Sequence, residues 1–432
     1  MKSEFEPAAA ASGNLALLAI LSLIAGALAG LVAAVFRLAL EQADRFRDLV
    51  LADMHADPRT GLPLIVATAA LATALAAWLV RRLAPQASGS GIPHVEAVLH
   101  GDLPPAPARL IPVKFLGGLL AIGSGLALGR EGPSVQMGAS IAHLLGTAFR
   151  CNADDCRALL AAGAGAGLAT AFNAPIAGAV FVLEELARRF DTRITIATLG
   201  ASAGAIAVAR LLVGQAPDFQ VTPLPYPGFE TLPVHLALGL GAGLLGVAYN
   251  RAILGALAVA DRLPACPVEL RAALIGAAVG LLAWFAPELV GGGDALTQRA
   301  LTVTDPLGLL AGVFALRFVL GAVSYAAATP GGLFAPMLVL GAQGGLLFGL
   351  VCGQWFPQVT ASPTDLAIVG MAAFFTAVVR APVTGIILAT ELTGGFTLLL
   401  PMLGACFTAM MVPALLDSAP IYDSLRERAL RR

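Results

Sequence analysis

A glutamate lies inside one of the most apolar parts of this chain, where it could carry ion or proton chemistry. Glu131 belongs to the run Gly-Arg-Glu-Gly-Pro at 129–133, and the apolar sequence resumes directly afterwards. A charge at bilayer depth costs about 2.5–3.5 kcal/mol, so such a residue is usually functional or paired. The glycines and the proline are typical of a broken helix, which is tolerated there against protein or a water-filled path. Glu131 is therefore the first candidate functional residue; a structural ion pair with Arg130 or Lys114 is the alternative.

Two further breaks of the same kind precede helical runs, Gly-Ser-Gly-Ile-Pro at 89–93 and Gly-Gly-Leu-Phe-Ala-Pro at 331–336. In each break the proline falls where a first helical turn accepts it. Glycines let backbone amides approach a ligand closely, and helix N-termini carry free N–H groups and a partial positive charge. Any one break could be a packing kink, but the three together predict a dipole-lined anion site, which binds weakly enough to release its ion. The predicted loop residues are Gly89, Gly91, Ile92, Pro93, Gly129, Arg130, Gly132, Pro133 and Gly332.

Helices that enter or cross a membrane must position these breaks. Hydrophobic residues make up 58% of the 432 residues and charged residues 12%, with a mean hydropathy of +0.84. A soluble protein carries about twice that charged fraction. Long apolar stretches predict an all-α polytopic membrane protein, although 134–148 and 175–187 are shorter than the roughly 20 residues of a spanning helix and predict partly crossing helices. The apolar stretches are 14–40, 61–80, 111–128, 194–213, 235–260, 271–290, 306–324, 336–351, 365–379 and 385–413.

Other features of the composition exclude several classes of protein. A net charge of −1 argues against a nucleic-acid-binding surface. The five cysteines form no CxxC pair, and no histidine stands near Cys151 and Cys156, so we expect no metal and no cofactor. The first apolar run lacks a short core with a cleavage site, so we interpret it as a membrane helix and not as a signal peptide. Clustered arginines predict a cytoplasmic location for the C-terminal tail and for the loop that carries Arg150 and Arg157.

The chain also resembles itself. Asn-Ala-Pro-Ile-Ala-Gly at 173–178 is followed by Glu184, and Arg-Ala-Pro-Val-Thr-Gly at 380–385 is followed at the same spacing by Glu391. Chance similarity is the alternative, and the residues alone leave open whether the repeat is inverted or parallel. Interrupted segments at matching places in two halves point to a binding site between them. The predicted organisation is one transmembrane domain, 1–432, with halves at about 14–215 and 233–416 and a C-terminal helix and tail at 417–432.

With these motifs the chain is similar to the CLC family of chloride channels and chloride/proton antiporters, of the bacterial type without cytoplasmic regulatory domains. The resemblance runs from about residue 14 to the C-terminus and rests on the three breaks, on Glu184 and Glu185, and on Tyr422. It implies two inverted-topology repeats with many tilted and partly spanning helices. It also implies a lipid-embedded homodimer in the bacterial inner membrane, with chloride and protons as its transported partners and no enzymatic activity.

The resemblance assigns roles at the anion site. The hydroxyls of Ser90 and Tyr422 would donate to a dehydrated chloride, and the backbone amides of Leu333 and Phe334 would complete its site. Glu131 would be the gate and the outer proton acceptor. A carboxylate can replace an anion on the same amides, and apolar surroundings or a neighbouring chloride favour its protonated form. Ser90 further implies a preference for chloride.

The resemblance also assigns an inner proton acceptor, Glu185. The alternative for Glu185 is a solvated helix end paired with Arg188 and Arg189. Glu391 is the repeat counterpart of Glu184 and is expected to be structural. Lys114 resembles a family lysine that raises the local potential, and snorkelling to the membrane surface is its alternative.

We therefore expect secondary active chloride/proton antiport. The alternative is a passive voltage-gated or pH-gated chloride channel of the same fold. Glu131 does not discriminate between the two, whereas Glu185 favours antiport because channel members commonly lack an inner acid. An intramembrane enzyme is disfavoured, because no Ser/His or paired-Asp motif occurs and none of the five histidines forms a metal-like pair.

Overall fold

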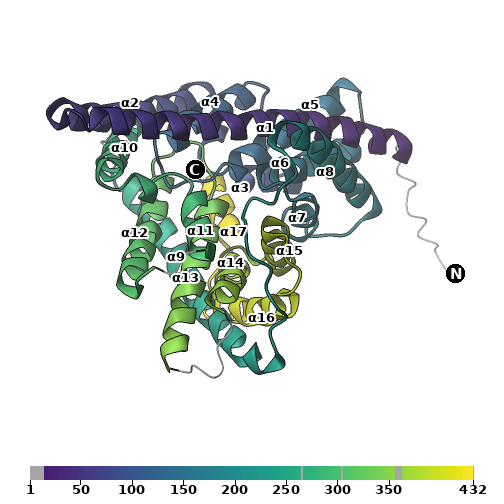
Figure 1. Cartoon of the computed structure of the whole chain (residues 1–432). Helices are drawn as coiled ribbons and strands as arrows, with labels where there is room; N and C mark the ends of the chain where they lie inside the picture. Colours follow the sequence, from purple (N-terminus) through teal and green to yellow (C-terminus); the bar gives the residue numbers. More distant parts are fainter. Residues whose placement is uncertain (1–13, 264–265, 303–304, 356–361, 432) are drawn as a thin grey trace.

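The predicted all-α membrane architecture is confirmed by the computed structural model, which describes residues 14–263, 266–302, 305–355 and 362–431. Positions 1–13 and 432 of the predicted domain and tail lie outside the described residues. In Figure 1 α1, α2, α4, α5, α6 and α8 (purple to teal) occupy the upper part of the molecule, α10 lies beside α2, and α9 and α12–α16 lie lower. The helices are α1 (Leu15–Met54), α2 (Pro58–Leu83), α3 (Ile92–His100), α4 (Leu110–Gly123), α5 (Glu131–Ala148), α6 (Ala153–Ala171), α7 (Pro175–Phe181), α8 (Thr192–Val213), α9 (Leu232–Asp261), α10 (Val268–Phe285), α11 (Asp294–Thr302), α12 (Leu307–Tyr325), α13 (Phe334–Trp355), α14 (Pro363–Val379), α15 (Pro382–Thr393), α16 (Leu399–Leu415) and α17 (Ile421–Leu430).

Within the described ranges, seven helices are long and apolar enough to cross a membrane: α1, α2, α8, α9, α10, α12 and α13. Two other helices, α6 and α14, are apolar over most of their length and almost entirely buried. Helix α6 is buried along nearly its whole length and consists mostly of alanine, glycine and leucine. Helix α14 is buried to the same degree in the second half. A helix that is apolar all round belongs inside a protein, so these two helices form the core against which the broken helices pack.

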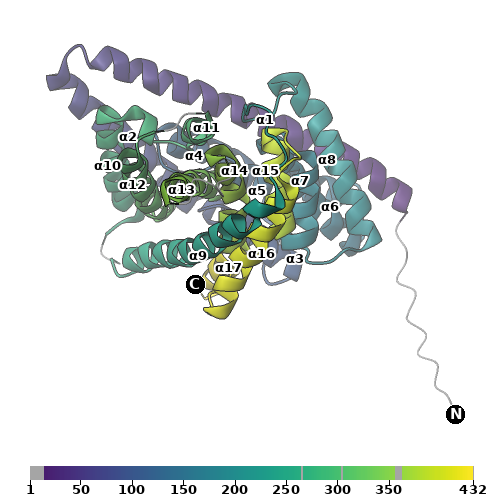
Figure 2. The same ribbon diagram turned by 60° about the horizontal axis from the view of Figure 1, so that its bottom comes forward.

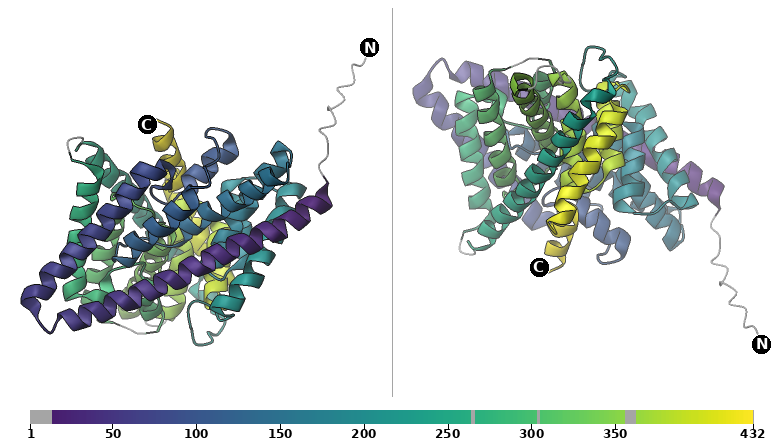
Figure 3. Two further views of the ribbon diagram at one scale, coloured as in Figure 1. Left: turned by 90° about the horizontal axis from the view of Figure 1, so that it is seen from above. Right: turned by 90° about the horizontal axis from the view of Figure 1, so that it is seen from below.

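Helix α1 extends beyond the apolar stretch predicted for it. It spans 40 residues, about 60 Å at 1.5 Å per residue, whereas the hydrocarbon core of a bilayer is about 30 Å thick. Figure 3 shows α1 running along one whole side of the molecule. Ion pairs at helical spacing, Arg37 with Glu41 and Arg47 with Asp44, line its polar C-terminal part. The stretch 14–40 therefore marks only the apolar part of this helix.

Close glycine crossings join matching helices in both halves. A Cβ atom on Gly163 of α6 would lie 2.3 Å from the carbonyl oxygen of Gly138 on α5. A Cβ atom on Gly370 of α14 would lie 2.4 Å from the carbonyl oxygen of Gly341 on α13. Small residues at such crossings let helix backbones approach closely, which is how membrane helices gain packing energy. The crossings hold α5 and α13, which begin at the central breaks, against the buried core.

The short helices α7 and α15 lie side by side and cap each other (Figure 2). The carboxylate of Glu391, on α15, accepts hydrogen bonds from the amides of Ile176 (3.1 Å) and Ala177 (2.7 Å) at the start of α7. The carboxylate of Glu184, which follows α7, accepts from the amides of Val383 (3.0 Å) and Thr384 (2.7 Å) at the start of α15. A carboxylate at a helix N-terminus satisfies free amides and complements the helix dipole. The repeated glutamates thus have reciprocal contacts.

Substituting Gly163 by valine is expected to lower stability by about 1–3 kcal/mol, because the added side chain overlaps the backbone of α5. The measurement is the thermal unfolding midpoint of the detergent-solubilised protein. Gly255→Ala on α9 is the matched control, because a Cβ atom there meets nothing within 4 Å. Equal midpoints for the two variants would contradict the importance of this crossing.

Candidate functional site

The three breaks predicted from the sequence meet at the centre of the molecule, joined by backbone hydrogen bonds. The amide of Gly89 donates to the carbonyl of Thr329 (3.1 Å), and the amide of Gly331 donates to the carbonyl of Gly89 (3.1 Å). Gly129 and Gly332 exchange two such bonds, of 2.9 and 2.7 Å. These bonds fix three loops from distant parts of the chain to one another. They therefore bring the N-termini of α3, α5 and α13 together.

Two loop positions require glycine. Gly91 precedes α3 with φ +87°, and a Cβ atom there would lie 2.3 Å from Oε1 of Gln136. Gly132 follows the central glutamate, and a Cβ atom there would lie 2.6 Å from Oγ of Ser90. Left-handed backbone favours glycine, and the second position leaves no room for a side chain. The glycines therefore let Ser90 lie directly against the start of α5.

The carboxylate of Glu131 lies on the N-terminus of another helix. Its Oε1 accepts a hydrogen bond of 2.8 Å from the amide of Ala335, in the first turn of α13. The side chain is 0% exposed, and Oε2 has no hydrogen-bond partner among the described residues. A helix N-terminus is a site for anions in general. The carboxylate thus occupies a position where a small anion could bind.

The predicted anion ligands are buried around this point. The hydroxyls of Ser90 and Tyr422 are both buried and lack a hydrogen-bond partner within the described part of the chain. Leu333 and Phe334 are 0% exposed at the start of α13, and the ring of Phe334 stacks on that of Tyr422 with centroids 6.1 Å apart. Buried polar groups are nearly always hydrogen-bonded, so two unpartnered hydroxyls call for a ligand.

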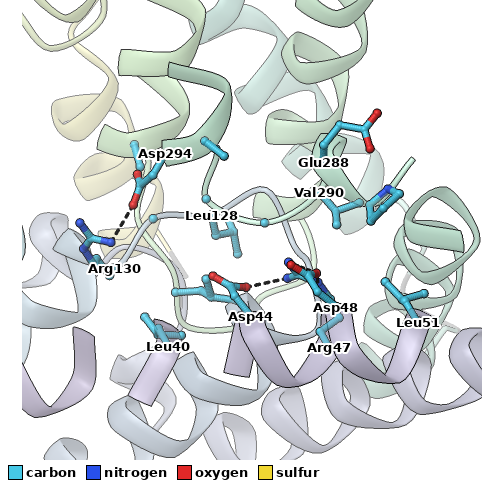
Figure 4. A pocket seen from close by; sticks show the side chains of 18 of the residues that line it. Leu40, Asp44, Arg47, Asp48, Leu51, Leu128, Arg130, Glu288, Val290 and Asp294 are labelled. Carbon is cyan, nitrogen blue, oxygen red and sulfur yellow. Dashed lines mark hydrogen bonds and ion pairs between the residues drawn. The ribbon is translucent and has the colours of Figure 1, made fainter. Parts of the chain in front are cut away.

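Neither alternative proposed for Glu131 from the sequence matches the contacts of Arg130 and Lys114. The guanidinium of Arg130 turns outward, with Nη1 2.7 Å from Asp294 and Nη2 3.2 Å from Asp218 (Figure 4). Lys114 is 0% exposed, and its Nζ donates to the carbonyls of two residues beside the first break, Ala87 and Gly89, at 3.0 and 2.7 Å. Arg130 therefore belongs to the loop through its backbone and anchors it through its side chain, and Lys114 does not snorkel.

A cavity of about 620 Å³ opens onto Glu131 from one side. It reaches Gly129, Arg130 and Glu131, and Figure 4 shows the charged side chains that line its mouth. The charged lining residues are Asp44, Arg47, Asp48, Arg130, Glu131, Glu288 and Asp294. The cavity gives ions access to the region of Glu131.

The second predicted acid, Glu185, lies just beyond the C-terminal end of α7. It belongs to a π-helical turn, Val182–Leu186, that continues α7, and it is only 3% exposed. Its carboxylate lies 3.5 Å from Nη2 of Arg188, whereas Arg189 pairs with Asp191. The solvated helix end is therefore wrong for Glu185, although the contact with Arg188 exists. π-Helical turns inside helices are frequent at functional sites.

Sequence reasoning missed several residues of these sites. Tyr325 accepts a hydrogen bond from the amide of Ser90 (3.3 Å), and Ala335 supplies the amide that holds Glu131. Glu96 is 0% exposed and contacts the same nitrogen of Arg188 as Glu185 does. The rule that intramembrane charges are functional could have found Glu96. Ala335 lies within the third break, whose pattern marks it as a source of free amides, whereas no local signal marks Tyr325, because tertiary packing alone creates its contact with Ser90.

Comparisons with known proteins identify a family model and several relatives that match most of the chain. The family model described as voltage gated chloride channel matches residues 72–414. The chain is 39% identical over 420 residues to the H(+)/Cl(−) exchange transporter ClcA of Vibrio cholerae serotype O1, covering 95% of this chain and 89% of the relative. It is 38% identical to the ClcA protein of Cronobacter sakazakii, covering 96% and 90%.

Solved structures of similar fold include two antiporters. A slow cyanobacterial Cl−/H+ antiporter superposes with a TM-score of 0.93 at 33% identity, covering 96% of this chain and 98% of that one. A CLC-type fluoride/proton antiporter superposes with a TM-score of 0.78 at 24% identity, covering 92% and 95%. The second likeness concerns the fold alone.

Substituting Lys114 by methionine is expected to weaken chloride binding and lower the unfolding midpoint. The change removes a buried positive charge and leaves the carbonyls of Ala87 and Gly89 without their donor, at about 1–3 kcal/mol for a buried unsatisfied group. Isothermal titration calorimetry measures the binding. Arg81→Gln, at an exposed cation, is the control. An unchanged chloride affinity would limit Lys114 to a structural role.

Proposed function

This chain belongs to the voltage-gated chloride channel family, and from that premise we propose that it exchanges chloride for protons by secondary active transport. It is a multi-pass integral membrane protein. Relatives named H(+)/Cl(−) exchange transporters match it over nearly its full length, which supports antiport over a passive channel. The observation that carries the proposal is the carboxylate of Glu131 on the amide of Ala335, with one oxygen buried and unpartnered.

Glu131 acts as the gate and the outer proton acceptor. An ionised carboxylate accepts the amide hydrogen bond strongly, because charge-assisted bonds are about twice as strong as neutral ones. Protonation removes that advantage, so the neutral side chain leaves the N-terminus of α13 and an anion takes its place. The cavity beside Arg130 supplies both ions from the outer side. Chloride occupancy and protonation at this position therefore favour each other.

The central chloride is held by Ser90, Tyr422 and the amides of Leu333 and Phe334. The support for these ligands is the burial of two hydroxyls without partners beside the start of α13. Hydroxyl and amide donors bind a halide without a full cation, which keeps the ion exchangeable. Lys114 lies behind the loop, where its Nζ donates to the carbonyl of Gly89. A positive charge there favours an anion on the other side of the loop without direct contact.

Glu185 acts as the inner proton acceptor. Its support is its burial at a π-helical turn and its position among charged groups from three elements. A buried carboxyl favours its protonated form, and a nearby arginine favours the ionised form, so both forms are accessible. Chloride and protons then share the region of Glu131 but use different inner routes.

We further propose an assembly and an orientation. The predicted repeat halves and the lipid-embedded homodimer of a bacterial inner membrane remain proposals, as does a cytoplasmic C-terminus. Bacterial relatives support the location. An exposed apolar face on α7, α15 and α16 supports the dimer, with Ile176, Val383, Leu403 and Phe407 each about half exposed or more. Cross-linking of single cysteines on that face in membranes tests the dimer, and an exclusively monomeric protein would contradict it.

In proteoliposomes a chloride gradient is expected to drive protons uphill in the opposite direction. Glu185→Gln is expected to abolish proton flux and retain chloride flux, because glutamine has the same shape but does not carry the proton. Chloride-selective electrodes and a pH electrode record both fluxes. Glu427→Gln, an exposed glutamate on α17, is the control. Chloride flux in the unmodified protein without any proton movement would contradict antiport.

Glu131→Gln is also expected to abolish proton flux and to leave chloride transport that no longer depends on external pH. The uncharged amide does not compete with an anion for the N-terminus of α13, so chloride binding tightens. Calorimetric titration with chloride measures the affinity, and the fluxes are recorded as above. Glu230→Gln, at an exposed glutamate, is the control. Retained proton coupling in Glu131→Gln would exclude the assigned role.

A further inference from the structure

Four charged side chains gather around the inner proton acceptor, Glu185, and the transport steps above use none of them. The inner charge cluster comprises Glu96 of α3, Glu185 and Arg188 at the end of the π-helical turn, and Asp423 and Arg426 of α17. Its members come from three separate parts of the sequence. The two glutamates are almost fully buried, whereas the side chain of Arg188 is 37% exposed and lies on the water side. Arg188 therefore covers Glu185 where a proton would enter.

Arg188 contacts all three carboxylates of the inner charge cluster through one nitrogen. Its Nη2 lies 2.8 Å from Asp423, 3.3 Å from Glu96 and 3.5 Å from Glu185. Its Nε also donates to the backbone carbonyl of Glu185 (3.1 Å). The backbone of Arg188 has φ +49°, which is uncommon for a residue with a side chain and tends to persist where the surroundings impose it. The turn thus directs the guanidinium back over Glu185.

The ion pair between Arg188 and Asp423 connects Arg188 to α17, the helix that carries Tyr422. Asp423 directly follows Tyr422, whose buried hydroxyl is a proposed chloride ligand. Helix α17 has only 10 residues, and Arg426 forms a second tether to Glu96 at 3.2 Å. The first two turns of α17 are therefore held by the inner charge cluster on one side and by the buried side chains of Ile421, Tyr422 and Leu425 on the other. Any change in those ion pairs acts on the backbone that carries Tyr422.

The cluster has an unbalanced charge. Three carboxylates face two guanidiniums, so a single proton makes the group neutral when all other members are ionised. His100 is the other titratable group at its edge, with Nδ1 3.1 Å from Nη1 of Arg426. The carboxylate of Glu184 is turned away toward α15. Competition among the carboxylates for Arg188 is therefore strongest when Glu185 is ionised.

We propose that Arg188 and Asp423 are positioning residues that link proton occupancy of Glu185 to the position of Tyr422 at the anion site. When Glu185 accepts a proton, Arg188 loses one competing carboxylate and closes on Asp423, which fixes α17 and keeps Tyr422 against Phe334. When Glu185 releases the proton, Arg188 is shared again and α17 loosens, which permits chloride to pass Tyr422. The protonated state of Glu185 thus hinders chloride passage at Tyr422, and the deprotonated state permits it, as coupling between two sites requires. This inference rests on the proposed antiport.

The test is the number of protons moved per chloride in proteoliposomes. Asp423→Asn and Arg188→Gln each remove one end of the contact, and we expect each to lower that ratio by about twofold or more while chloride flux persists, a modest effect in line with a partly exposed ion pair. The double variant is expected to match either single one, because both remove the same link. Asp423→Glu keeps the charge and is expected to restore the ratio. Glu427→Gln, on the same helix but outside the cluster, is the control.

The outcomes separate this inference from the proposed function. An unmodified protein that moves no protons against a chloride gradient would contradict antiport itself. A coupled unmodified protein with unchanged ratios in Asp423→Asn and Arg188→Gln would overturn the link alone. Additive losses in the double variant would also overturn it, since they would mean two independent effects. If Asp423→Asn does not fold, Arg188→Gln decides, because its side chain is partly exposed and size-exclusion chromatography checks its fold.

Discussion

The structure depends on one arrangement, the convergence of three helix N-termini that are held together by backbone hydrogen bonds between their loops. The pairs between Gly89 and Gly331 and between Gly129 and Gly332 bring together amides that no single helix could supply. These amides make it possible to bury the carboxylate of Glu131, because a buried charge needs donors. The same amides suit a halide, so under the proposed mechanism the carboxylate of Glu131 and chloride compete for one set of dipoles. Exchange of one anion for the other follows from that competition.

Small residues make this convergence possible. Broken helices expose backbone groups, which are tolerated in a membrane only where protein surrounds them. The buried helices α6 and α14 provide that surrounding, and their glycine crossings with α5 and α13 bring the breaks inward. Helices α2, α8 and α10 are less than half buried along their most apolar segments and expose apolar side chains on the outside of the molecule. The protein therefore exposes apolar side chains at its surface and buries a small number of polar groups at the breaks inside a largely apolar core.

The two halves of the chain contribute unequally to function. Their short helices cap each other through Glu184 and Glu391 in matching geometry, which is a structural role shared by both halves. Only the first half places a second acid, Glu185, beside its capping glutamate, where the second half has Leu392. The inner charge cluster forms around that additional acid. The proposed inner proton acceptor thus lies at a position where the two similar segments differ.

The sequence by itself determined the membrane class, the three breaks and the position of an acid at 131, because hydropathy, proline and glycine act locally. It pointed to Glu185 only through the resemblance to a family. It also indicated the repeat, since related halves keep their motifs in order. Only the tertiary structure decided which amide holds Glu131, that Lys114 is buried, and that Arg130 turns to Asp294. It likewise decided that Asp423 faces Arg188. These contacts join residues far apart in the chain, and their geometry depends on how α13 and α17 pack, which no local pattern encodes.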